Sequence, residues 1–369
     1  MQCAEELFEN IVDKNHPDDT VLTIIQGSGT LPRSESSRNI RYDEKGVANY
    51  KRVNAYDYII HLRSFEGGLE MANSQGIISP AYTVLRSKKE FAPFFYDAYF
   101  HTDEFINHIL AKSVEGIRDG RQISYEAFKW LPIPTCNIEE QKKIADLFCV
   151  LNDRIKVQQL LVDSLKKYKR GVVSKLIKGS MAFANSSGMV LKKVGDFCDV
   201  QMCKRIFREQ TAPIGEVPFY KIGTIGGKPD AYITRALYDE YRKKYSFPRK
   251  GEFLISCAGT VGKCVLYNGE DSYYQDSNIV WLRNNSEDVT NEYLYVLVSN
   301  VDWSTLNSTT ITRIYNDNLR DLSFYIPPVP MQKKITSYIF ALTNRIDKEQ
   351  EILERIQKEK AGLLQQLFI

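Results

Sequence analysis

The sequence predicts an α+β protein in which two globular domains, each mainly antiparallel β-sheet with helices, are separated by two long antiparallel helices forming a coiled coil. The first observation is a repeat, because QKKIADLFCVLNDRI at 141–155 returns as QKKITSYIFALTNRI at 332–346. The surrounding residues 123–177 align without a gap on 314–368, which lie 191 positions later. The second is length, since 369 residues exceed what one hydrophobic core usually serves. A repeat of this length indicates two units that end in the same element.

Each copy of the repeat is predicted to be a long helix with a heptad seam. Its apolar residues recur at steps of four and three, which is the spacing of a coiled-coil stripe. The predicted seam residues are Ile144, Phe148, Leu151, Ile155, Val162, Leu165, Val172 and Leu176 in the first copy, and Ile335, Ile339, Leu342, Ile346, Leu353, Ile356, Leu363 and Leu367 in the second. A helix of about 40 residues would be about 60 Å long.

Polar residues interrupt both seams at matched places. Gln158 and Glu349 occupy one such place, and Lys169 and Lys360 occupy the other. If an approximate twofold axis relates the units, the helices pair antiparallel, and a register with Lys169 opposite Glu349 also puts Lys360 opposite Gln158. Because polar seam residues fix register at some cost in stability, we hold this register as a hypothesis. The alternative is two ordinary amphipathic helices, each packed on its own domain core.

Segments that contain proline precede both helices. Proline disfavours the helical conformation for the residue before it and is tolerated in a first helical turn, so these segments are predicted to be extended arms that lead into helices. A short stretch of small and polar residues follows the first helix and is predicted to be a linker. The predicted division is a first domain at 1–135, a helix at 136–178, the linker at 179–189, a second domain at 190–325 and a helix at 326–369.

The two globular stretches share a pattern more than they share residues. Strand-like runs around glycine turns are expected at 252–267 and 277–283 in the second domain, and at 56–68 and 81–86 in the first. Helical patterns follow at 290–300 and 91–100. This alternation predicts α+β domains with mainly antiparallel sheets.

Composition limits the classes of protein that fit. The acidic start MQCAEELFEN does not resemble a signal peptide, and no apolar run approaches the roughly 18 residues of a membrane span. The seven cysteines follow no regular spacing, which favours reduced thiols over a zinc site or a disulfide framework. We therefore expect a cytoplasmic protein.

The familiar catalytic signatures are missing from the sequence. GTIGGKP (223–229) and GTVGKC (259–264) depart from a phosphate-binding loop in spacing or in its Ser or Thr. There is no Asn-Pro-Pro-Tyr tetrapeptide that could bind a flipped adenine, and the four histidines are scattered. KPDAY and DEYRK resemble a nuclease metal site only loosely. We expect no catalytic residue, no metal and no cofactor in this chain.

Nearly the whole chain resembles the specificity subunits of type I DNA restriction-modification systems. The resemblance rests on ISYEAFKWLPIP, EEQKKIADLF and LNDRI in the first half, and on IYNDNLRDLSFYIPPVP, MQKKITSYIF and LTNRI in the second. GEFLISCAGTVGK is also similar to part of their recognition domains. The first domain departs from the pattern, because it has no obvious counterpart of VLKKVGDFCDVQMCKRI (190–206) and starts abruptly.

The resemblance implies a non-catalytic subunit that binds double-stranded DNA. Each globular domain would be a target-recognition domain that reads one half of a split target, and the conserved spacer helices would set the gap. The resemblance also implies assembly with two methyltransferase subunits and with restriction/translocase subunits. These partners would use S-adenosylmethionine, and ATP with Mg²⁺, respectively.

Clusters of basic and polar residues are the candidate DNA-binding positions, because such side chains can neutralise phosphates and reach base edges. A solvated surface role is the alternative for each of them, and the net charge of +3 is mild for a DNA-binding protein. The candidates are Arg33, Arg38, Arg41, Lys51, Arg52, Lys204, Arg205, Arg208, Lys228, Arg242, Lys243, Lys244, Thr310 and Arg313.

Two other classes of protein remain open at this point. A coiled-coil scaffold with protein-binding heads would show no salt-sensitive affinity for duplex DNA, whereas a DNA reader would. A self-contained restriction enzyme would need methylase and nuclease motifs that this sequence lacks.

Overall fold

The two copies of the repeat form helices α5 (Ile138–Ile177, 40 residues) and α9 (Val329–Leu367, 39 residues). The computed structural model describes residues 1–36, 44–116, 122–177, 188–303 and 313–368. The chain divides into two compact units, one formed by Met1–Leu160 with Gln350–Ile369 and the other by Leu161–Glu349. Each unit contains one end of both helices, so the helix pair can be described within each unit separately.

In the first unit the start of α5 packs against the end of α9. The rings of Phe148 and Phe368 stack with centroids 6.3 Å apart, and both side chains belong to the buried core of this unit together with Ala145. Leu363 and Leu364 of α9 pack against the same core. The start of one helix therefore meets the end of the other.

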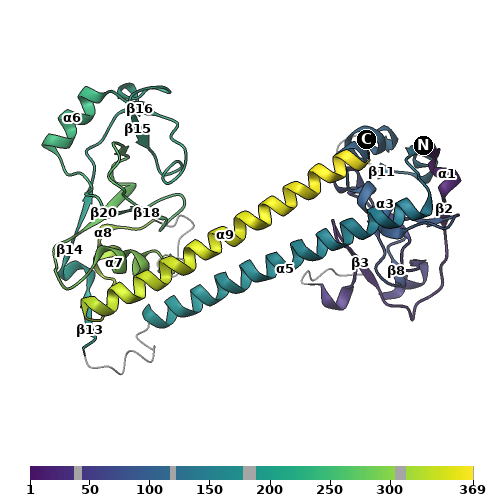
Figure 1. Ribbon diagram of the computed structural model, residues 1–369, viewed down its shortest axis with the longest axis horizontal. Coiled ribbons are helices and arrows are strands. Elements are labelled where there is room, and N and C mark those ends of the chain that lie inside the picture. The colour runs from purple at the N-terminus through teal and green to yellow at the C-terminus, as the bar shows by residue number, and fades with distance from the viewer. Residues whose placement is uncertain (37–43, 117–121, 178–187, 304–312, 369) are drawn as a thin grey trace. The chain divides into compact units, whose positions relative to one another are not determined.

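In the second unit the end of α5 packs against the start of α9. Val173 and Leu176 share a buried cluster with Ile335 and Ile339. The hydroxyl groups of Tyr168 and Tyr338 also form a hydrogen bond of 2.9 Å. The two helices are therefore antiparallel, as predicted (Figure 1).

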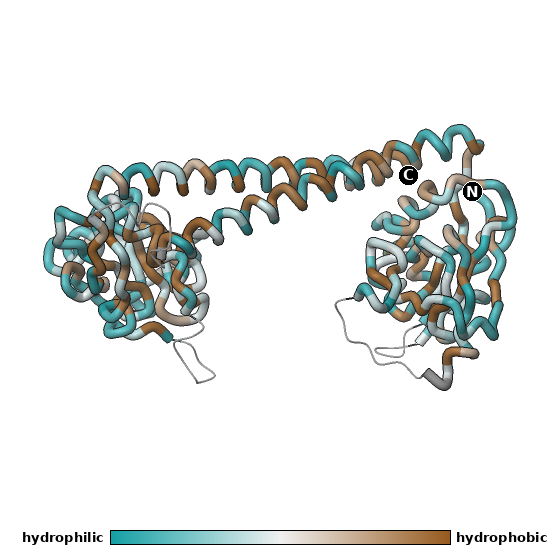
Figure 2. Tube along the Cα trace, turned by 90° about the horizontal axis from the view of Figure 1, so that it is seen from below, coloured by the Kyte–Doolittle hydropathy of each residue, from teal (hydrophilic) through white to brown (hydrophobic). Residues whose placement is uncertain are grey.

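The predicted seam residues are buried or half-buried, apart from Leu367. Hydrophobic residues recur along both helices (Figure 2). Leu367 is 41% exposed, so this part of the seam prediction is wrong, and the neighbouring Phe368 is buried instead. The physical reason is that α9 ends at Leu367, where helical periodicity no longer decides which side chain faces the core.

Lys169 is half-buried in the second unit, where it lines one cavity with Thr343 and Asn344 and another with Thr343 and Asp347. Burial lowers the pKa of Lys169, and the charge of Asp347 acts against this shift. The register hypothesis named Glu349 as the residue opposite Lys169, and Glu349 forms an ion pair of 3.8 Å with Arg345 along its own helix. Asp347, two residues before Glu349, is thus an acidic neighbour of Lys169.

The first unit is built around a four-stranded antiparallel sheet with the order β2-β9-β6-β7. The strands of this unit are β1 (Gln2–Cys3), β2 (Phe8–Ile11), β3 (Leu22–Ile25), β4 (Gly29–Pro32), β5 (Lys51–Val53), β6 (Tyr58–Ile60), β7 (Glu70–Met71), β8 (Gly76–Ile78), β9 (Thr83–Ser87), β10 (Val114–Glu115), β11 (Gln122–Ile123) and β12 (Pro132–Ile133). The pairs β1-β12, β3-β4, β5-β8 and β10-β11 form small two-stranded sheets. The short helices are α1 (Ala4–Leu7), α2 (Ser64–Gly67), α3 (Pro93–Phe100) and α4 (Tyr125–Phe128), with a π-helix at Glu104–Ile109 and 3₁₀ turns at Arg33–Glu35, Glu44–Asn49 and Leu110–Ser113.

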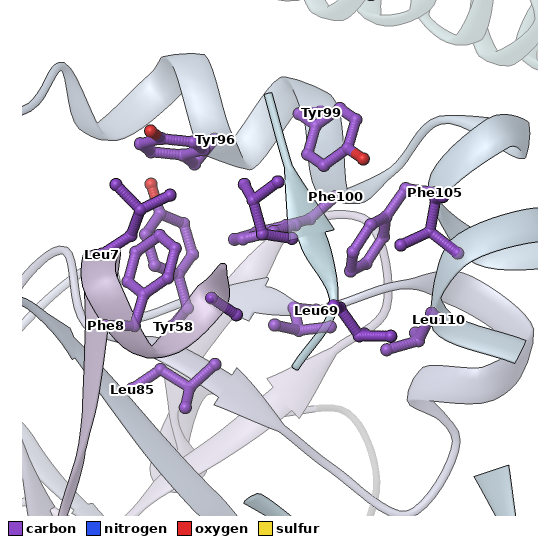
Figure 3. Close-up of a cluster of buried hydrophobic side chains, with 14 of the residues drawn as sticks. Leu7, Phe8, Tyr58, Leu69, Leu85, Tyr96, Tyr99, Phe100, Phe105 and Leu110 are labelled. Carbon is purple, nitrogen blue, oxygen red and sulfur yellow. The ribbon is translucent and has the colours of Figure 1, made fainter. Parts of the chain in front are cut away.

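Aromatic side chains fill the core between this sheet and α3 (Figure 3). Phe8 from β2 lies edge-on to Tyr58 from β6 and to Tyr96 from α3, with centroids 5.7 and 5.3 Å apart. Phe100 of α3 lies edge-on to Tyr58 at 5.0 Å. Edge-to-face pairs of this kind add about 0.5–1.5 kcal/mol each beyond area burial, so they hold the sheet and the helix in one arrangement.

The second unit has a four-stranded antiparallel sheet with the order β14-β20-β17-β18, and a three-stranded sheet with the order β16-β15-β19. Its strands are β13 (Val190–Lys193), β14 (Cys198–Met202), β15 (Val217–Tyr220), β16 (Tyr232–Ile233), β17 (Phe253–Ser256), β18 (Cys264–Leu266), β19 (Tyr273–Tyr274), β20 (Ile279–Asn284) and β21 (Ser323–Ile326). Its short helices are α6 (Arg235–Lys244), α7 (Asn291–Val298) and α8 (Asn316–Arg320), with 3₁₀ turns at Val194–Asp196 and Arg208–Gln210. The predicted linker at 179–189 lies almost entirely outside the described residues.

The two four-stranded sheets have the same topology. β2, β9, β6 and β7 follow one another across the first sheet as β14, β20, β17 and β18 do across the second. The strand before each sheet also matches. β1 pairs with β12, the last strand before α5, and β13 pairs with β21, the last strand before α9. The first domain therefore has a structural counterpart of residues 190–206, although its sequence shows no obvious one. Strand pairing uses backbone groups, so it persists where side chains have diverged.

We expect Leu353→Ala to lower the free energy of unfolding by about 2–5 kcal/mol, because Leu353 is almost fully buried on α9 and its truncation leaves a cavity. Leu367→Ala, at the exposed end of the same helix, should change it by only about 0.5 kcal/mol. Urea unfolding followed by circular dichroism at 222 nm, where helix dominates, would measure both. Equal effects of the two substitutions would contradict the seam described above.

Candidate nucleic-acid interface

A groove of about 710 Å³ opens in the second unit and is the clearest candidate for a nucleic-acid interface. It is bordered by basic, amide and hydroxyl side chains, and Phe207 at its edge is half exposed. The residues that line it are Arg205, Ile206, Phe207, Arg208, Thr211, Ala212, Pro213, Phe219, Lys221, Asp230, Ala231, Gln275, Asp276 and Asn278. The structure thus brings two of the predicted residues, Arg205 and Arg208, into one site.

Two of the three basic side chains in the groove are held by acidic neighbours. Arg205 forms an ion pair with Asp276, and Lys221 forms one of 3.0 Å with Asp230. Arg208 is exposed and forms no ion pair with any residue that the structure describes. Arg208 is therefore the cation of the groove whose charge is most available to an anionic ligand.

Local hydrogen bonds position these side chains. The turn that carries Arg208 is closed by Gln210, whose side-chain oxygen accepts a hydrogen bond of 2.9 Å from the backbone N–H of Phe207. The hydroxyl of Thr211 donates to the carbonyl of Arg208 at 2.8 Å. Gln275 is also held in place, because its backbone N–H donates to the carbonyl of Tyr220 in β15 at 2.8 Å. The groove walls are thus defined by short-range contacts.

This set of side chains has the chemistry of DNA readout. Arginine and lysine pair with phosphates, while arginine also binds guanine and asparagine or glutamine binds adenine through two hydrogen bonds. Gln275, Asn278 and Lys221 were not among the residues predicted from sequence. Gln275 and Asn278 lie in the short QDSN segment between β19 and β20, and a cluster of polar residues between two strand patterns is the only signal that could have pointed to them.

The basic residues at the end of α6 are largely engaged inside the unit. Arg242 pairs with Asp271 at 3.1 Å, and its guanidinium lies over the rings of Tyr238 and Phe247. Hydrogen bonds from Arg235 and Tyr238, together with the charges of Arg235 and Arg242, hold the pKa of Asp271 below its usual value. Arg242 therefore has a structural role that the sequence did not reveal.

The remaining candidates of the second unit that the structure describes do not line the groove. Lys244 pairs with Glu240 at 2.8 Å, and Lys204 lies 5.4 Å from the centre of the Tyr245 ring. Lys228 and Lys243 are exposed. The guanidinium of Arg313 lies over the ring of Tyr315, and Thr310 falls outside the described residues.

Three candidates of the first unit lie in the described residues and are half-buried: Arg33, and Lys51 and Arg52, which belong to β5. Arg52 pairs with Asp19 at 3.0 Å, and the Lys51 ammonium donates to the carbonyl of Tyr82 at 2.5 Å. Burial and the nearby Lys14 lower the pKa of Lys51. Arg33 directly follows β4, whereas Arg38 and Arg41 lie outside the described residues.

A buried carboxylate supports the hairpin that leads to Arg33. Glu70 is fully buried and accepts hydrogen bonds from the backbone N–H groups of Gly27 and Gly29, at 2.6 and 2.8 Å. Both glycines have positive φ, and a Cβ on Gly29 would lie 2.5 Å from the carbonyl oxygen of Met71. Burial disfavours a charged His101, but the hydrogen bond to Glu70 and the charges of Asp97 and Glu70 raise the pKa of His101 overall. The hairpin is therefore fixed by a buried polar network.

The described residues contain no group of three or more His, Cys, Asp or Glu side chains arranged to hold a metal ion. Within the same parts of the chain, no helix combines the length and the apolar character that crossing a membrane would require.

The fold and the site define a class of protein: two β-rich units of the same topology, each joined to a long helix, with a polar groove suited to nucleic acid in the second unit. Comparisons with known proteins agree with this class. Residues 186–358 match the family described as the type I restriction modification DNA specificity domain. A type I restriction enzyme specificity subunit of Haemophilus influenzae is 50% identical over 157 residues, which cover 42% of this chain and 41% of that protein.

Two solved structures share the fold over the full length of the chain. The crystal structure of a type I restriction-modification system S subunit from M. genitalium is 14% identical, with a TM-score of 0.60, and is covered over 95% of its length. A chain from a study of complex assembly and conformational transition in a type I restriction-modification system is 16% identical, with a TM-score of 0.59, and is covered over 96% of its length. Residues 186–358 therefore carry a type I restriction modification DNA specificity domain, and the fold of the whole chain is similar to that of these solved subunits.

We expect Arg208→Ala to weaken binding to duplex DNA and to reduce the slope of log affinity against log salt by about 1, the value for one lost phosphate contact. Lys334→Ala on α9 removes one exposed charge outside the groove and should leave the slope unchanged. Fluorescence anisotropy at several salt concentrations would measure both variants. An unchanged slope for Arg208→Ala would show that the groove does not contact phosphate.

Proposed function

We propose that this chain is the DNA sequence-recognition subunit of a type I restriction-modification complex. It reads a bipartite target with two recognition domains, residues 1–135 and 190–325, and it has no catalytic activity of its own. The observation that carries this proposal is the duplicated architecture, in which two sheets of the same strand order lead through similar arms into paired helices. A duplicated reader whose loops have diverged is suited to two different half-sites on one duplex.

In this proposal the length of the helix pair sets the gap between the two half-sites. Helices of 40 and 39 residues are each about 60 Å long, which corresponds to roughly 18 base pairs at about 3.4 Å per step. Because the helices are antiparallel, the core of each unit packs against the start of one long helix and the end of the other. The candidate DNA-binding residues predicted from sequence, except Arg242, together with Lys221, Gln275 and Asn278, would provide the phosphate and base contacts.

Exchanging residues 1–135 for those of a relative should alter one half of the target only. Inserting one heptad in both helices, after residue 158 in α5 and after residue 349 in α9, should lengthen the gap by about 3 base pairs and keep both half-sites, because seven residues add about 10.5 Å and preserve the seam. Methylation-sensitive sequencing of DNA from cells that carry the chain and its methyltransferase would identify the targets.

The same seven residues inserted in the linker at 179–189 serve as the control and should leave the gap as it was. A change in both half-sites after exchange of one domain would contradict the modular reader. So would a gap that stays constant when both helices are lengthened.

The partners in this proposal are two methyltransferase subunits and the restriction/translocase subunits. The methyltransferase would bring S-adenosylmethionine and flip the target base, at a cost of a few kcal/mol for unstacking, and the translocase would bring ATP and Mg²⁺. This chain would supply position and sequence choice in the cytoplasm, where the DNA is.

An apolar face on α5 supports the assembly with partners. Leu147, Val150, Val157 and Leu160 recur at helical spacing and are 40–66% exposed, although Phe148 and Leu151 beside them pack against the core of the first unit. Exposed apolar residues on one helix face suit a partner helix. The methyltransferase is the partner that we propose for this face.

We expect Val150→Glu combined with Val157→Glu to reduce co-purification of the methyltransferase at least tenfold, because the substitution puts two charges into an apolar contact. Val190→Glu, at a similarly exposed valine on β13, should leave co-purification unchanged. Affinity purification from cells that express both subunits, with the circular dichroism of each variant as a folding check, would measure this. Full recovery of the methyltransferase by the double variant would exclude this face as its docking site.

A further inference from the structure

Two buried glutamines occupy the same place in the two units. Gln141 lies at the start of α5 and Gln332 at the start of α9, 191 positions apart, and they are 4% and 0% exposed. A glutamine side chain has two donors and one acceptor oxygen, so burying it is costly unless partners are present. The contacts of these residues explain why glutamine stands at both positions.

In the first unit Gln141 connects three segments. Its side-chain oxygen accepts a hydrogen bond of 3.1 Å from the backbone N–H of Ala92, the residue that immediately precedes α3. Its side-chain amide donates to the carbonyl of Cys136 in the arm before α5, at 2.9 Å. The start of the long helix is thereby attached to the arm and to a helix of the globular core.

In the second unit Gln332 makes the corresponding connections. Its oxygen accepts a hydrogen bond of 2.8 Å from the backbone N–H of Thr290, the N-cap residue of α7. Its amide donates to the carbonyls of Pro327 in the arm, at 2.8 Å, and of Asp288, at 2.6 Å. Cys136 and Pro327 are themselves 191 positions apart, so the same joint is built twice from backbone groups of different residues.

The geometry of such a joint restricts direction more than apolar packing does. Hydrogen bonds weaken steeply when donor and acceptor are misaligned, whereas hydrophobic contact is non-directional. A tilt of about 5° at the start of a helix about 60 Å long moves its far end by about 5 Å. This displacement exceeds one base-pair step of about 3.4 Å, so a small loss of angular control would become visible in the gap.

We propose that Gln141 and Gln332 are positioning residues that fix the angle at which each long helix leaves its recognition domain, and that they thereby restrict the target to one gap length. This inference rests on the function proposed above. The two glutamines contact no DNA in this proposal. They act through the helices that they hold.

The test uses the full chain co-expressed with its methyltransferase, with Gln332→Leu or Gln141→Leu to remove all hydrogen bonds of one side chain. Methylation-sensitive sequencing should find both half-sites unchanged, and at least a tenfold rise in the methylated fraction at sites whose gap is one base pair longer or shorter. Gln332→Glu keeps the acceptor for Thr290 and loses both donors. It serves as the second variant where circular dichroism shows that the leucine variant does not fold.

Thr336→Val is the matched control. Thr336 is buried on α9, and its hydroxyl donates to the carbonyl of Gln332 at 3.0 Å, so the substitution removes a hydrogen bond that stays within the helix. It should lower stability without widening the range of gaps. A uniform fall in methylation with a single gap length in the glutamine variants would overturn the inference. Absence of any split target for the unaltered chain would instead overturn the proposed function.

Discussion

The rest of the structure depends on the apolar faces of α5 and α9. Each face runs along the helix, from the globular core at one end to buried residues such as Leu353 and Ile356. Burying each such side chain stabilises the fold by about 1.5–3 kcal/mol, so the two faces are stable only when they pair. Antiparallel pairing then follows from the repeat, since it lets each helix start beside its own sheet and end against the other unit's core.

Apolar pairing alone leaves direction and register weakly defined, and polar groups supply both. Gln141 and Gln332 tie each helix start to backbone groups of a globular core. Lys169 and Lys360 stand half-buried at matched places on the helices, where burial lowers the pKa of each and a nearby aspartate acts against that shift. Polar groups at a seam cost stability, and their value lies in excluding other registers.

The electrostatics of the candidate interface favour specificity over unselective attraction. Arg205 and Lys221 are paired with Asp276 and Asp230 inside the groove, and Arg242 is held by Asp271 and two aromatic rings. Acidic partners orient a basic side chain and also reduce its pull on any phosphate. The mild net charge of +3 agrees with a DNA-binding protein whose basic side chains are oriented by acidic neighbours.

The sequence by itself determined the two long helices, their heptad faces and the duplicated plan, because the periodicity of a helix and the recurrence of a segment are visible without any knowledge of contacts. Strands such as β17 and β20 were also found at the expected places, since glycine turns and apolar runs define them locally. Only the tertiary structure decided that Gln2–Ile11 matches residues 190–206, that Gln275 and Asn278 line one groove with Arg208, and that Phe368 replaces Leu367 in the core. These features arise from backbone pairing and from contacts between distant segments, and side-chain patterns along the chain do not encode them directly.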